Sequence, residues 1–484
     1  MKHIRLIAAI VLSLSLFLQG CASQSRLERI ASGAQSIVEK EKEINEKLES
    51  GKMTEKELEE EAEELEKDVE NMTKEELVKY MEEREKAAKE RAVKEAEEFR
   101  KNHVDDEYPR DPALVFDVYS PGYVNVYFDW LSPEYGYYID FAICTGYRGT
   151  AEEVRIPNTY NGMPVVAVGS SKEHSFAGLK RIELPDSVQI IDNNTFRGSN
   201  IESIGLSDNL KYIGREAFRY CGNLKSIEIP EGVKSIEEEA FSLCVSLREI
   251  NLGNVVYIAV DSFNGCSSLQ TVNIPSGITE IWSGTFENCE SLESVTIPDG
   301  VKSIGTDAFR GCHSLKNITI PDSVESIGAA AFAHCKSLTS VSIPDNVAFS
   351  ERKHQNSAFM SRNLPSEVYA LQKEDRLSGY YSRSSHVGGA FEFCTSLQEV
   401  SIGKNVSYIS QHAFAGCISL NSVNLPENLV EIGENAFMAC YSLTDISLPK
   451  SLEIIGDDAF SLVPLNPDVR NEVLLINYDA TEPS

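Results

Sequence analysis

Residues 291–312 read SLESVTIPDGVKSIGTDAFRGC, and close copies of this stretch recur along most of the chain. Successive copies are 20 to 23 residues apart, except for one interval of 59 residues. A fixed period in this range is typical of a solenoid, in which stacked coils bury one continuous core. Each copy carries a phenylalanine, usually after an alanine, and these repeat phenylalanines are Phe176, Phe196, Phe218, Phe241, Phe263, Phe286, Phe309, Phe332, Phe391, Phe414, Phe437 and Phe460.

Each copy divides into segments with different patterns. Apolar and polar residues alternate over 292–297, which predicts a half-buried strand. Pro298–Gly300 predicts a turn, because proline presets φ and glycine tolerates the conformation that follows. A second apolar edge follows at 301–304, and residues 305–312 would fold their apolar side chains beneath it. A single coil would bury these residues on one side only, so neighbouring coils must stack.

Nine of the 11 cysteines occur three residues after a repeat phenylalanine. Equivalent positions of stacked coils should lie about 5 Å apart, a distance that would permit disulfides. A uniform row, however, gives no cysteine a unique partner, and parallel side chains point the wrong way for closure. No Cys-x-x-Cys and no recurrent histidine accompanies them, which argues against metal binding. We therefore predict reduced, buried thiols that pack as small hydrophobic residues: Cys221, Cys244, Cys266, Cys289, Cys312, Cys335, Cys394, Cys417 and Cys440.

The pattern Leu-x-x-Ile-x-Ile-Pro-x-x-Val-x-x-Ile-Gly-x-x-Ala-Phe-x-x-Cys-x-Ser resembles the BspA-type leucine-rich repeat, also called the Treponema pallidum type. The resemblance covers about residues 135–462. It implies a leucine-rich-repeat solenoid, rich in parallel β-strands, with short turns or helical segments in each coil of ~23 residues. Proteins with this repeat occur on the surface of bacteria and some protists and are mostly described as adhesins or binders of host proteins. The resemblance thus implies a binding protein but names no ligand.

The N-terminus has the layout of a secretory signal, with Lys2 and Arg5 before an almost unbroken apolar run over 6–18. This run is shorter than the ~20 residues of a membrane-spanning helix. Residues 18–21, LQGC, resemble the lipobox of bacterial lipoproteins, in which the cysteine is acylated. We therefore expect residues 1–20 to be a lipoprotein signal peptide, Cys21 to be lipidated, and the protein to lie at the outer membrane or cell surface. An ordinary signal peptide with a chance cysteine is the alternative.

Two regions of different composition precede the repeats. Residues 21–103 are dominated by glutamate and lysine and predict a charged α-helical stalk, either a coiled coil or a solvated spacer. Residues 104–150 are rich in aromatic residues, and 115–119 and 123–127 alternate like the strands of a hairpin. A repeat array cannot leave its first coil bare, so we expect an aromatic β cap at 104–150. An aromatic patch that stacks on a ligand is the alternative.

The repeats are expected at 151–462, with a C-terminal cap and tail at 463–484. The interval of 59 residues indicates an insertion at 348–387, which is locally basic in an acidic chain. Loops on a rigid scaffold often carry function, and long loops are also often disordered, so both interpretations stay open. Candidate ligand-binding residues in the insertion are Arg352, His354, Arg362, Arg376, Tyr380 and Tyr381.

The outward-facing strand positions form a second candidate binding surface. They stand between the two buried residues of each predicted strand and carry short polar side chains, which suit an extended protein or glycan partner. The same residues could also be filler that only keeps the strands soluble. The candidates are Asn251, Asn273, Thr296, Thr319, Ser342, Ser401 and Asn424.

The charge balance and the motifs exclude several functions. A net charge of −30 repels phosphate backbones and argues against nucleic acid as a partner. The sequence has no His-Glu-x-x-His, no Gly-x-Ser-x-Gly, no phosphate loop and no Gly-x-Gly-x-x-Gly, so we predict no catalytic residue, metal or cofactor. We expect a non-enzymatic, lipid-anchored surface protein that binds a protein or glycan of a host or neighbouring cell. The alternative is a periplasmic or envelope scaffold that self-associates through its helical stalk.

Overall fold

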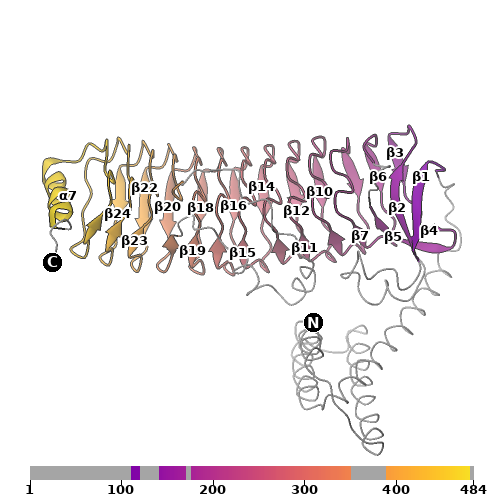
Figure 1. The fold of residues 1–484 in the computed structure, drawn as a ribbon, viewed down its shortest axis with the longest axis horizontal. Coiled ribbons are helices and arrows are strands. Elements are labelled where there is room, and N and C mark those ends of the chain that lie inside the picture. The colour runs from indigo at the N-terminus through magenta and orange to yellow at the C-terminus, as the bar shows by residue number, and fades with distance from the viewer. Residues whose placement is uncertain (1–110, 120–140, 170–175, 350–387, 480–484) are drawn as a thin grey trace, which may run out of the picture. The chain divides into compact units, whose positions relative to one another are not determined.

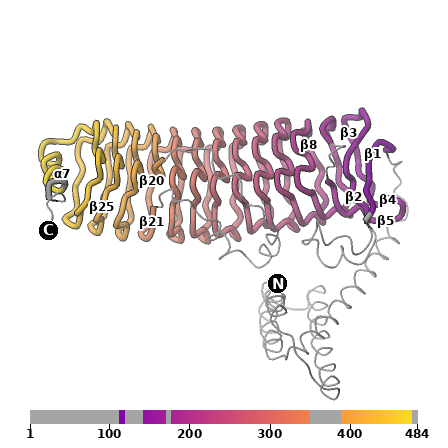
Figure 2. Tube along the Cα trace, viewed as in Figure 1, coloured from indigo at the N-terminus to yellow at the C-terminus, as the bar shows by residue number. Residues whose placement is uncertain are grey.

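The computed structural model describes residues 111–119, 141–169, 176–349 and 388–479, and the repeats within them form a parallel β-solenoid (Figure 1). About twelve coils stack in a row, and the Cα trace in Figure 2 follows them one after another. The expected leucine-rich-repeat solenoid is therefore confirmed. The predicted helical stalk at 21–103 and the lipidation site Cys21 lie outside the described residues, as do the six candidate residues of the insertion.

Most coils contribute one short strand to a row of parallel strands that we call the first sheet, which hydrogen bonding divides into three consecutive segments. We call its outward side the strand face. Most of these strands expose their outer residues and bury the one between them, because the side chains of a strand alternate between its two sides. The central residues Ile204 and Val423 are only half-buried. The first-sheet strands are β3 (Glu153–Arg155), β6 (Arg181–Glu183), β8 (Ser203–Gly205), β10 (Ser226–Glu228), β12 (Glu249–Asn251), β14 (Thr271–Asn273), β16 (Ser294–Thr296), β18 (Asn317–Thr319), β20 (Ser340–Ile343), β22 (Glu399–Ile402) and β24 (Ser422–Asn424).

The apolar edge that follows the turn of each coil forms a second row of strands, which we call the second sheet and which hydrogen bonding also divides into three segments. Its strands are β1 (Leu114–Tyr119), β2 (Phe141–Tyr147), β5 (Met163–Val168), β7 (Ile190–Ile191), β9 (Tyr212–Ile213), β11 (Ser235–Ile236), β13 (Tyr257–Ile258), β15 (Glu280–Ile281), β17 (Ser303–Ile304), β19 (Ser326–Ile327), β21 (Ala348–Phe349), β23 (Tyr408–Ile409), β25 (Glu431–Ile432) and β26 (Ile454–Ile455). The short β4 (Thr159–Tyr160) pairs antiparallel with β5. The neighbouring coils pair in parallel, residue against equivalent residue, as in Ser303↔Ser326 and Ile304↔Ile327.

The third side of most coils is a turn with two residues in the left-handed region, and in the coil of Phe391 only Phe393 has this conformation. In the coil of Phe309 the two residues are Asp307 (φ 56°) and Gly311 (φ 73°), two residues before and after the phenylalanine. The backbone N–H groups of residues 307, 309 and 311 donate to carbonyls of the next coil at 2.7 to 3.0 Å. The alternating backbone thus pairs from coil to coil without a strand, which satisfies its polar groups.

The core is a column of phenylalanines beside a column of thiols. Consecutive phenylalanine rings lie 5.1 to 5.5 Å apart between centroids and are stacked from Phe196 onward. The described cysteines are free and buried, as predicted. Beyond the prediction, each repeat thiol donates a hydrogen bond to the backbone carbonyl of the phenylalanine one coil earlier, at 3.0 to 3.4 Å. The cysteine therefore packs as a small apolar residue and also bonds to the neighbouring coil.

The Ile-Gly pair of the repeat marks a close approach of two coils. A Cβ atom on Gly305 would lie 2.6 Å from the backbone nitrogen of Ser283 and 2.8 Å from the carbonyl carbon of Trp282. Equivalent contacts at Gly328, Gly433 and Gly456 are 2.4 to 2.6 Å. Only glycine leaves room for the preceding coil in these places.

Two boundaries of the repeat array differ in detail from the sequence prediction. The first two residues of the predicted insertion, Ala348 and Phe349, form β21 and pair with Ser326 and Ile327, because Phe349 fills the buried place that isoleucine holds elsewhere. At the N-terminal end, β1 pairs with β2 in the second sheet. The second strand of the expected hairpin, 123–127, lies outside the described residues.

A helix that the sequence analysis missed follows the last coil. α7 (Pro467–Asp479) packs against β26, with Val469 buried (Figure 1). Its start has ordinary helix signals, since the side chain of Asn466 accepts a hydrogen bond from the N–H of Val469 at 3.0 Å and Pro467 occupies the first helical position. Among the described residues, no helix is long and apolar enough to cross a membrane.

Candidate binding surface

The strand face contains a block of eight short polar side chains without charge. Strands β14, β16, β18 and β20 each expose two of them and bury a valine or isoleucine in between. We call this block the neutral field, and it consists of Thr271, Asn273, Ser294, Thr296, Asn317, Thr319, Ser340 and Ser342.

The neutral field is regular because β14, β16 and β18 pair in register, and β20 lies next to β18 at the start of the following group of paired strands. Asn273 lies beside Thr296, and Thr296 lies beside Thr319. Equivalent side chains on parallel neighbours are separated by the strand spacing of ~4.8 Å. The field is therefore two columns of hydroxyl and amide groups that repeat along the solenoid.

The groups in the neutral field are available for contacts. Within the described part of the chain, none of the eight side chains makes a hydrogen bond to another protein group. The backbone beneath them is already paired between strands, for example at Val295↔Ile318. The free hydrogen-bonding capacity of this face thus belongs to its side chains.

Acidic side chains lie at both ends of the neutral field. Along one side of the field, a positive and a negative side chain offset each other. Glu249 of β12 precedes it and Glu399 of β22 follows it. The residues just before the four strands are Gln270, Glu293, Lys316 and Thr339, and Lys316 Nζ lies 2.8 Å from Glu293 Oε2. The field and this border together carry no net charge, in a chain whose net charge is −30.

Six of the seven strand-face candidates from the sequence are exposed: Asn251, Asn273, Thr296, Thr319, Ser342 and Asn424. Ser401 differs from the expectation and is half-buried. Its side chain lies in register between Ser342 and Asn424 on the two neighbouring strands. The structure therefore brings the strand-face candidates into one row, with the neutral field as its central part.

An ion-pair network on the third side was not found from the sequence. Arg219 lies 3.1 Å from Glu216 and also contacts Glu239, and Arg197 reaches Glu216 at 3.2 Å. The side chains of Arg219, Glu216 and Glu239 are only 10 to 14% exposed. The guanidinium of Arg219 also lies 4.9 Å above the ring of Tyr220. These contacts join three coils. They also pair the charged groups with one another, so these groups do not remain for an ion pair with a ligand.

Several carboxyl groups in and near this network have raised pKa values, among them Glu238, Glu239 and Asp261. Desolvation raises the pKa of Glu237 to about 7. Desolvation also raises the pKa of Glu287 to about 7, helped by the negative charges of Asp307 and Asp261 and opposed by Arg310. Among the described residues, no group of three or more His, Cys, Asp or Glu side chains is arranged to hold a metal ion.

Most of the repeat thiols have raised pKa values, whereas the side-chain hydrogen bond with Cys244 lowers the pKa of Cys221. Burial raises the pKa of Cys266 to about 12, and it raises the pKa of Cys289 well above the usual value. A thiolate is the nucleophilic form of cysteine, so these groups are inert in the folded chain.

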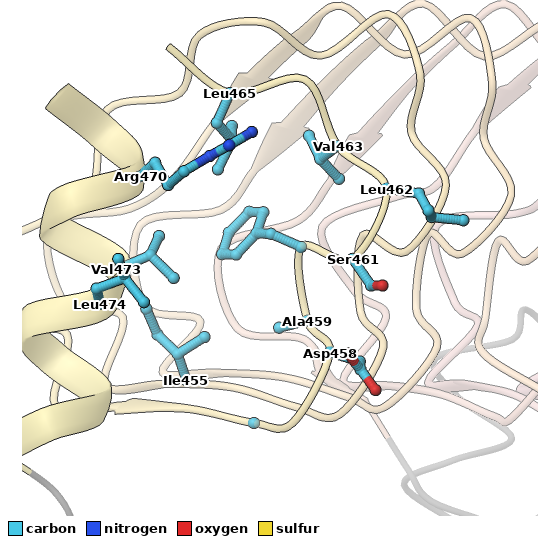
Figure 3. Close-up of a pocket in the computed structure, with 12 residues that line it drawn as sticks. Ile455, Asp458, Ala459, Ser461, Leu462, Val463, Leu465, Arg470, Val473 and Leu474 are labelled. Carbon is cyan, nitrogen blue, oxygen red and sulfur yellow. The ribbon is translucent and has the colours of Figure 1, made fainter. Parts of the chain in front are cut away.

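A hollow lies between α7 and the last coil, lined by side chains that include Val463, Leu465, Arg470 and Val473 (Figure 3). Its lining is mainly apolar, and Val463 and Leu465 are buried. We interpret it as the closed end of the core, because few polar groups converge on it.

Stacked coils with a buried phenylalanine column and one strand each on a continuous face define a leucine-rich-repeat protein. The sequence profile of the BspA type leucine rich repeat region matches residues 170–293, 252–365 and 387–468. These ranges make up more than half of the chain, and the protein belongs to this family.

Solved structures of bacterial proteins resemble the chain. A leucine-rich repeat protein from Bacteroides ovatus is 24% identical, with 74% of this chain and 92% of that chain covered and a TM-score of 0.49. The T. pallidum leucine rich repeat protein is 28% identical, with 43% and 91% covered and a TM-score of 0.36. A leucine rich cell surface protein from Faecalibacterium prausnitzii is 24% identical, with 76% and 98% covered and a TM-score of 0.37. None of the curated proteins matches the chain.

Leucine-rich repeats are in general non-enzymatic scaffolds that bind proteins or other macromolecules. In the described residues the geometry is of this kind, with an extended exposed face and inert buried thiols.

Proposed function

We propose that the protein is an exported, lipid-anchored adhesin that binds a macromolecule of a host or neighbouring cell through its strand face. The observation that carries this proposal is the neutral field, eight exposed hydrogen-bonding side chains on four adjacent strands. The negative charge around the neutral field repels polyanions. The field itself has no charge, so it is complementary to an uncharged polar partner.

The physical properties of the field favour binding. Serine and threonine side chains have few rotatable bonds, so a partner that orders them loses little conformational entropy. The strands beneath are tied into a rigid sheet, which keeps the groups at fixed positions before contact. Pre-organised groups of this kind lower the free-energy cost of association.

The N-terminal part of the proposal depends on sequence pattern alone. Residues 1–20 would direct export, acylated Cys21 would hold the chain at the membrane, and the glutamate- and lysine-rich segment 21–103 would lift the solenoid away from it. Replacement of Cys21 by alanine is expected to release the protein from the membrane fraction. Retention of the Cys21→Ala variant in that fraction would contradict lipid anchoring.

The basic insertion, which begins after Phe349, is proposed as a second contact. A variant that lacks residues 350–387 keeps β21 and is expected to bind target cells more weakly than the wild type. Undiminished binding by this variant would remove the insertion from the proposal and leave the strand face as the sole contact.

The strand face is tested with two matched variants of the fluorescently labelled chain 22–484. Thr296→Arg/Thr319→Arg places two bulky cations in the neutral field. Thr279→Arg/Ala348→Arg adds the same charge at exposed positions beside and within the second sheet. We expect the first variant to lose at least tenfold in affinity for target cells and the second to bind like the wild type. Equal binding by both variants, with the same circular dichroism spectrum and Tm, would contradict the proposal.

A further inference from the structure

Equivalent side chains of the neutral field recur at a regular spacing, and this spacing fits some polar polymers better than others. Parallel strands in register place equivalent side chains one strand spacing apart, as in Ser294↔Asn317 and Thr296↔Thr319. This spacing is ~4.8 Å. A ligand that bonds equally to successive strands must advance by nearly the same distance from one unit to the next.

We propose that the neutral field binds a linear, uncharged β-1,4-linked glycan, with one sugar ring over each strand. In an extended chain of this linkage, successive pyranose rings advance by close to the strand spacing. Neighbouring rings are turned over in this flat ribbon, so each strand meets the hydroxyls of a ring in one of two orientations. The inference rests on the proposed function and names the class of its ligand.

An extended polypeptide fits the field less well. Side chains on one side of a polypeptide strand recur every second residue, at about 6.6 to 6.8 Å, so they fall out of step with a ~4.8 Å repeat after one or two strands. A glycan with α-1,4 linkages fits less well too, because its rings turn progressively about the chain axis and do not present one face to a flat surface.

The chemistry of the field matches ring hydroxyls. Each strand offers two groups, and a hydroxyl such as that of Thr296 can donate one hydrogen bond and accept others. The amides of Asn273 and Asn317 also both donate and accept. A sugar ring presents the same mixture of donors and acceptors, so the partners need no charge on either side.

The size of the field predicts the length of glycan that it holds. Four strands contribute, from β14 to β20, and carboxylates bracket them at Glu249 and Glu399. The field should therefore fill with about four sugar rings. It contains no aromatic side chain to stack on a ring, so binding depends on the number of hydrogen bonds and should rise with chain length up to a tetrasaccharide.

The experiment uses isothermal titration of the chain 22–484 with three neutral tetrasaccharides. Cellotetraose and chitotetraose are β-1,4-linked, and maltotetraose is the α-1,4-linked control. We expect binding of at least one β-1,4-linked tetrasaccharide at least tenfold tighter than of maltotetraose and of the corresponding disaccharide. Absence of binding, or equal binding of maltotetraose, would overturn the inference.

Two matched valine variants test whether the tetrasaccharide binds at the strand face. Thr296→Val/Thr319→Val removes two hydroxyls and keeps a β-branched shape that suits a strand, so the fold should persist. It is expected to weaken tetrasaccharide binding about 30-fold, because two hydrogen bonds of ~1 kcal/mol each are lost. Thr279→Val/Thr306→Val removes two hydroxyls elsewhere and should have no effect. Equal affinity of both variants would overturn the inference.

Failure of the glycan inference is distinguishable from failure of the proposed function. If Thr296→Arg/Thr319→Arg abolishes cell binding while β-1,4-linked tetrasaccharides do not bind, the strand face is an adhesive surface for another ligand and only the glycan inference falls. Loss of cell binding after protease treatment of the target cells would identify that ligand as a protein. If the arginine variant still binds cells, the proposed function falls as well.

Discussion

The thiol of Cys312 donates a hydrogen bond to the backbone carbonyl oxygen of Phe286, 3.3 Å away in the preceding coil. The same contact recurs for every repeat cysteine, so one side chain both fills the core and links two coils. Covalent pairing of two thiols would remove their protons and with them two of these bonds. The cysteines therefore stabilise the stack as reduced thiols.

Replacement of Cys312 should show both contributions. Cys312→Ala removes the donor and leaves a small void, so we expect the free energy of unfolding to fall by about 1 to 3 kcal/mol. Cys312→Ser keeps a donor and should cost less. Lys316→Ala, at an exposed position, should change the free energy by less than about 0.5 kcal/mol. Chemical denaturation measures all three, and an alanine variant as stable as the wild type would contradict this role.

Thiol labelling tests the burial of the cysteine column. Folded chain 22–484 should resist iodoacetamide at all ten described cysteines, because all ten are buried and the reagent does not reach them. In denaturant all ten should react. Mass spectrometry reads out each site. Rapid labelling of Cys289 or Cys312 in the folded protein, or a disulfide between them, would disagree with the structure.

The close approach of the coils predicts different outcomes for two glycines. Gly305→Ala would place a methyl group 2.6 Å from the backbone of Ser283, so the coils must shift, at a cost of about 1 to 3 kcal/mol. Gly178→Ala meets no heavy atom within 4 Å and should be nearly neutral. A Tm for Gly305→Ala equal to that of Gly178→Ala would show that the coils have more room than described.

Glu237 predicts a pH dependence of stability. Its pKa is about 7 in the folded chain and 4.5 in the unfolded chain, so between these pH values only the folded chain holds the proton. The stabilisation is complete below pH 4.5 and is lost as the pH rises through 7. Glu237→Gln should therefore be more stable than the wild type at pH 7.5, by about 2 kcal/mol, and not at pH 4.5.

The control for this prediction is Glu325→Gln, which changes an exposed carboxylate. Differential scanning calorimetry at the two pH values gives the comparison. A stability difference between wild type and Glu237→Gln that does not change with pH would show that Glu237 titrates normally. Glu287 should add a contribution of the same sign, since its pKa is also raised to about 7.

Most of the solenoid could be predicted because its determinants are local and repeated. The alternation at 292–297 and the spacing of Phe286 and Phe309 are visible in the sequence, and stacking is the way to bury them. The outward position of Thr296 and Thr319 follows from the same alternation. The thiol hydrogen bond was missed, because it joins Cys312 to a carbonyl 26 residues earlier and needs the relative placement of two coils.

Other features were missed for similar physical reasons. The contacts of Arg219 with Glu216 and Glu239 depend on which residues of three coils come together on the third side. The left-handed positions had a sequence signal, since Asp307 and Gly311 are of types that adopt this conformation, but the spacing around the phenylalanine was not used. The start of α7 at Asn466 and Pro467 was also readable and was overlooked.

Site-specific photocross-linking on intact target cells shows whether the strand face itself contacts a macromolecule of those cells. p-Benzoylphenylalanine at Thr319 stands in the neutral field, and the same group at Thr279 stands beside the second sheet. We expect the group at position 319 to form cross-linked adducts with a target-cell macromolecule, and the group at position 279 to form none above background. Adducts from position 279 alone, or none from position 319 while the protein binds the cells, would contradict binding through the strand face.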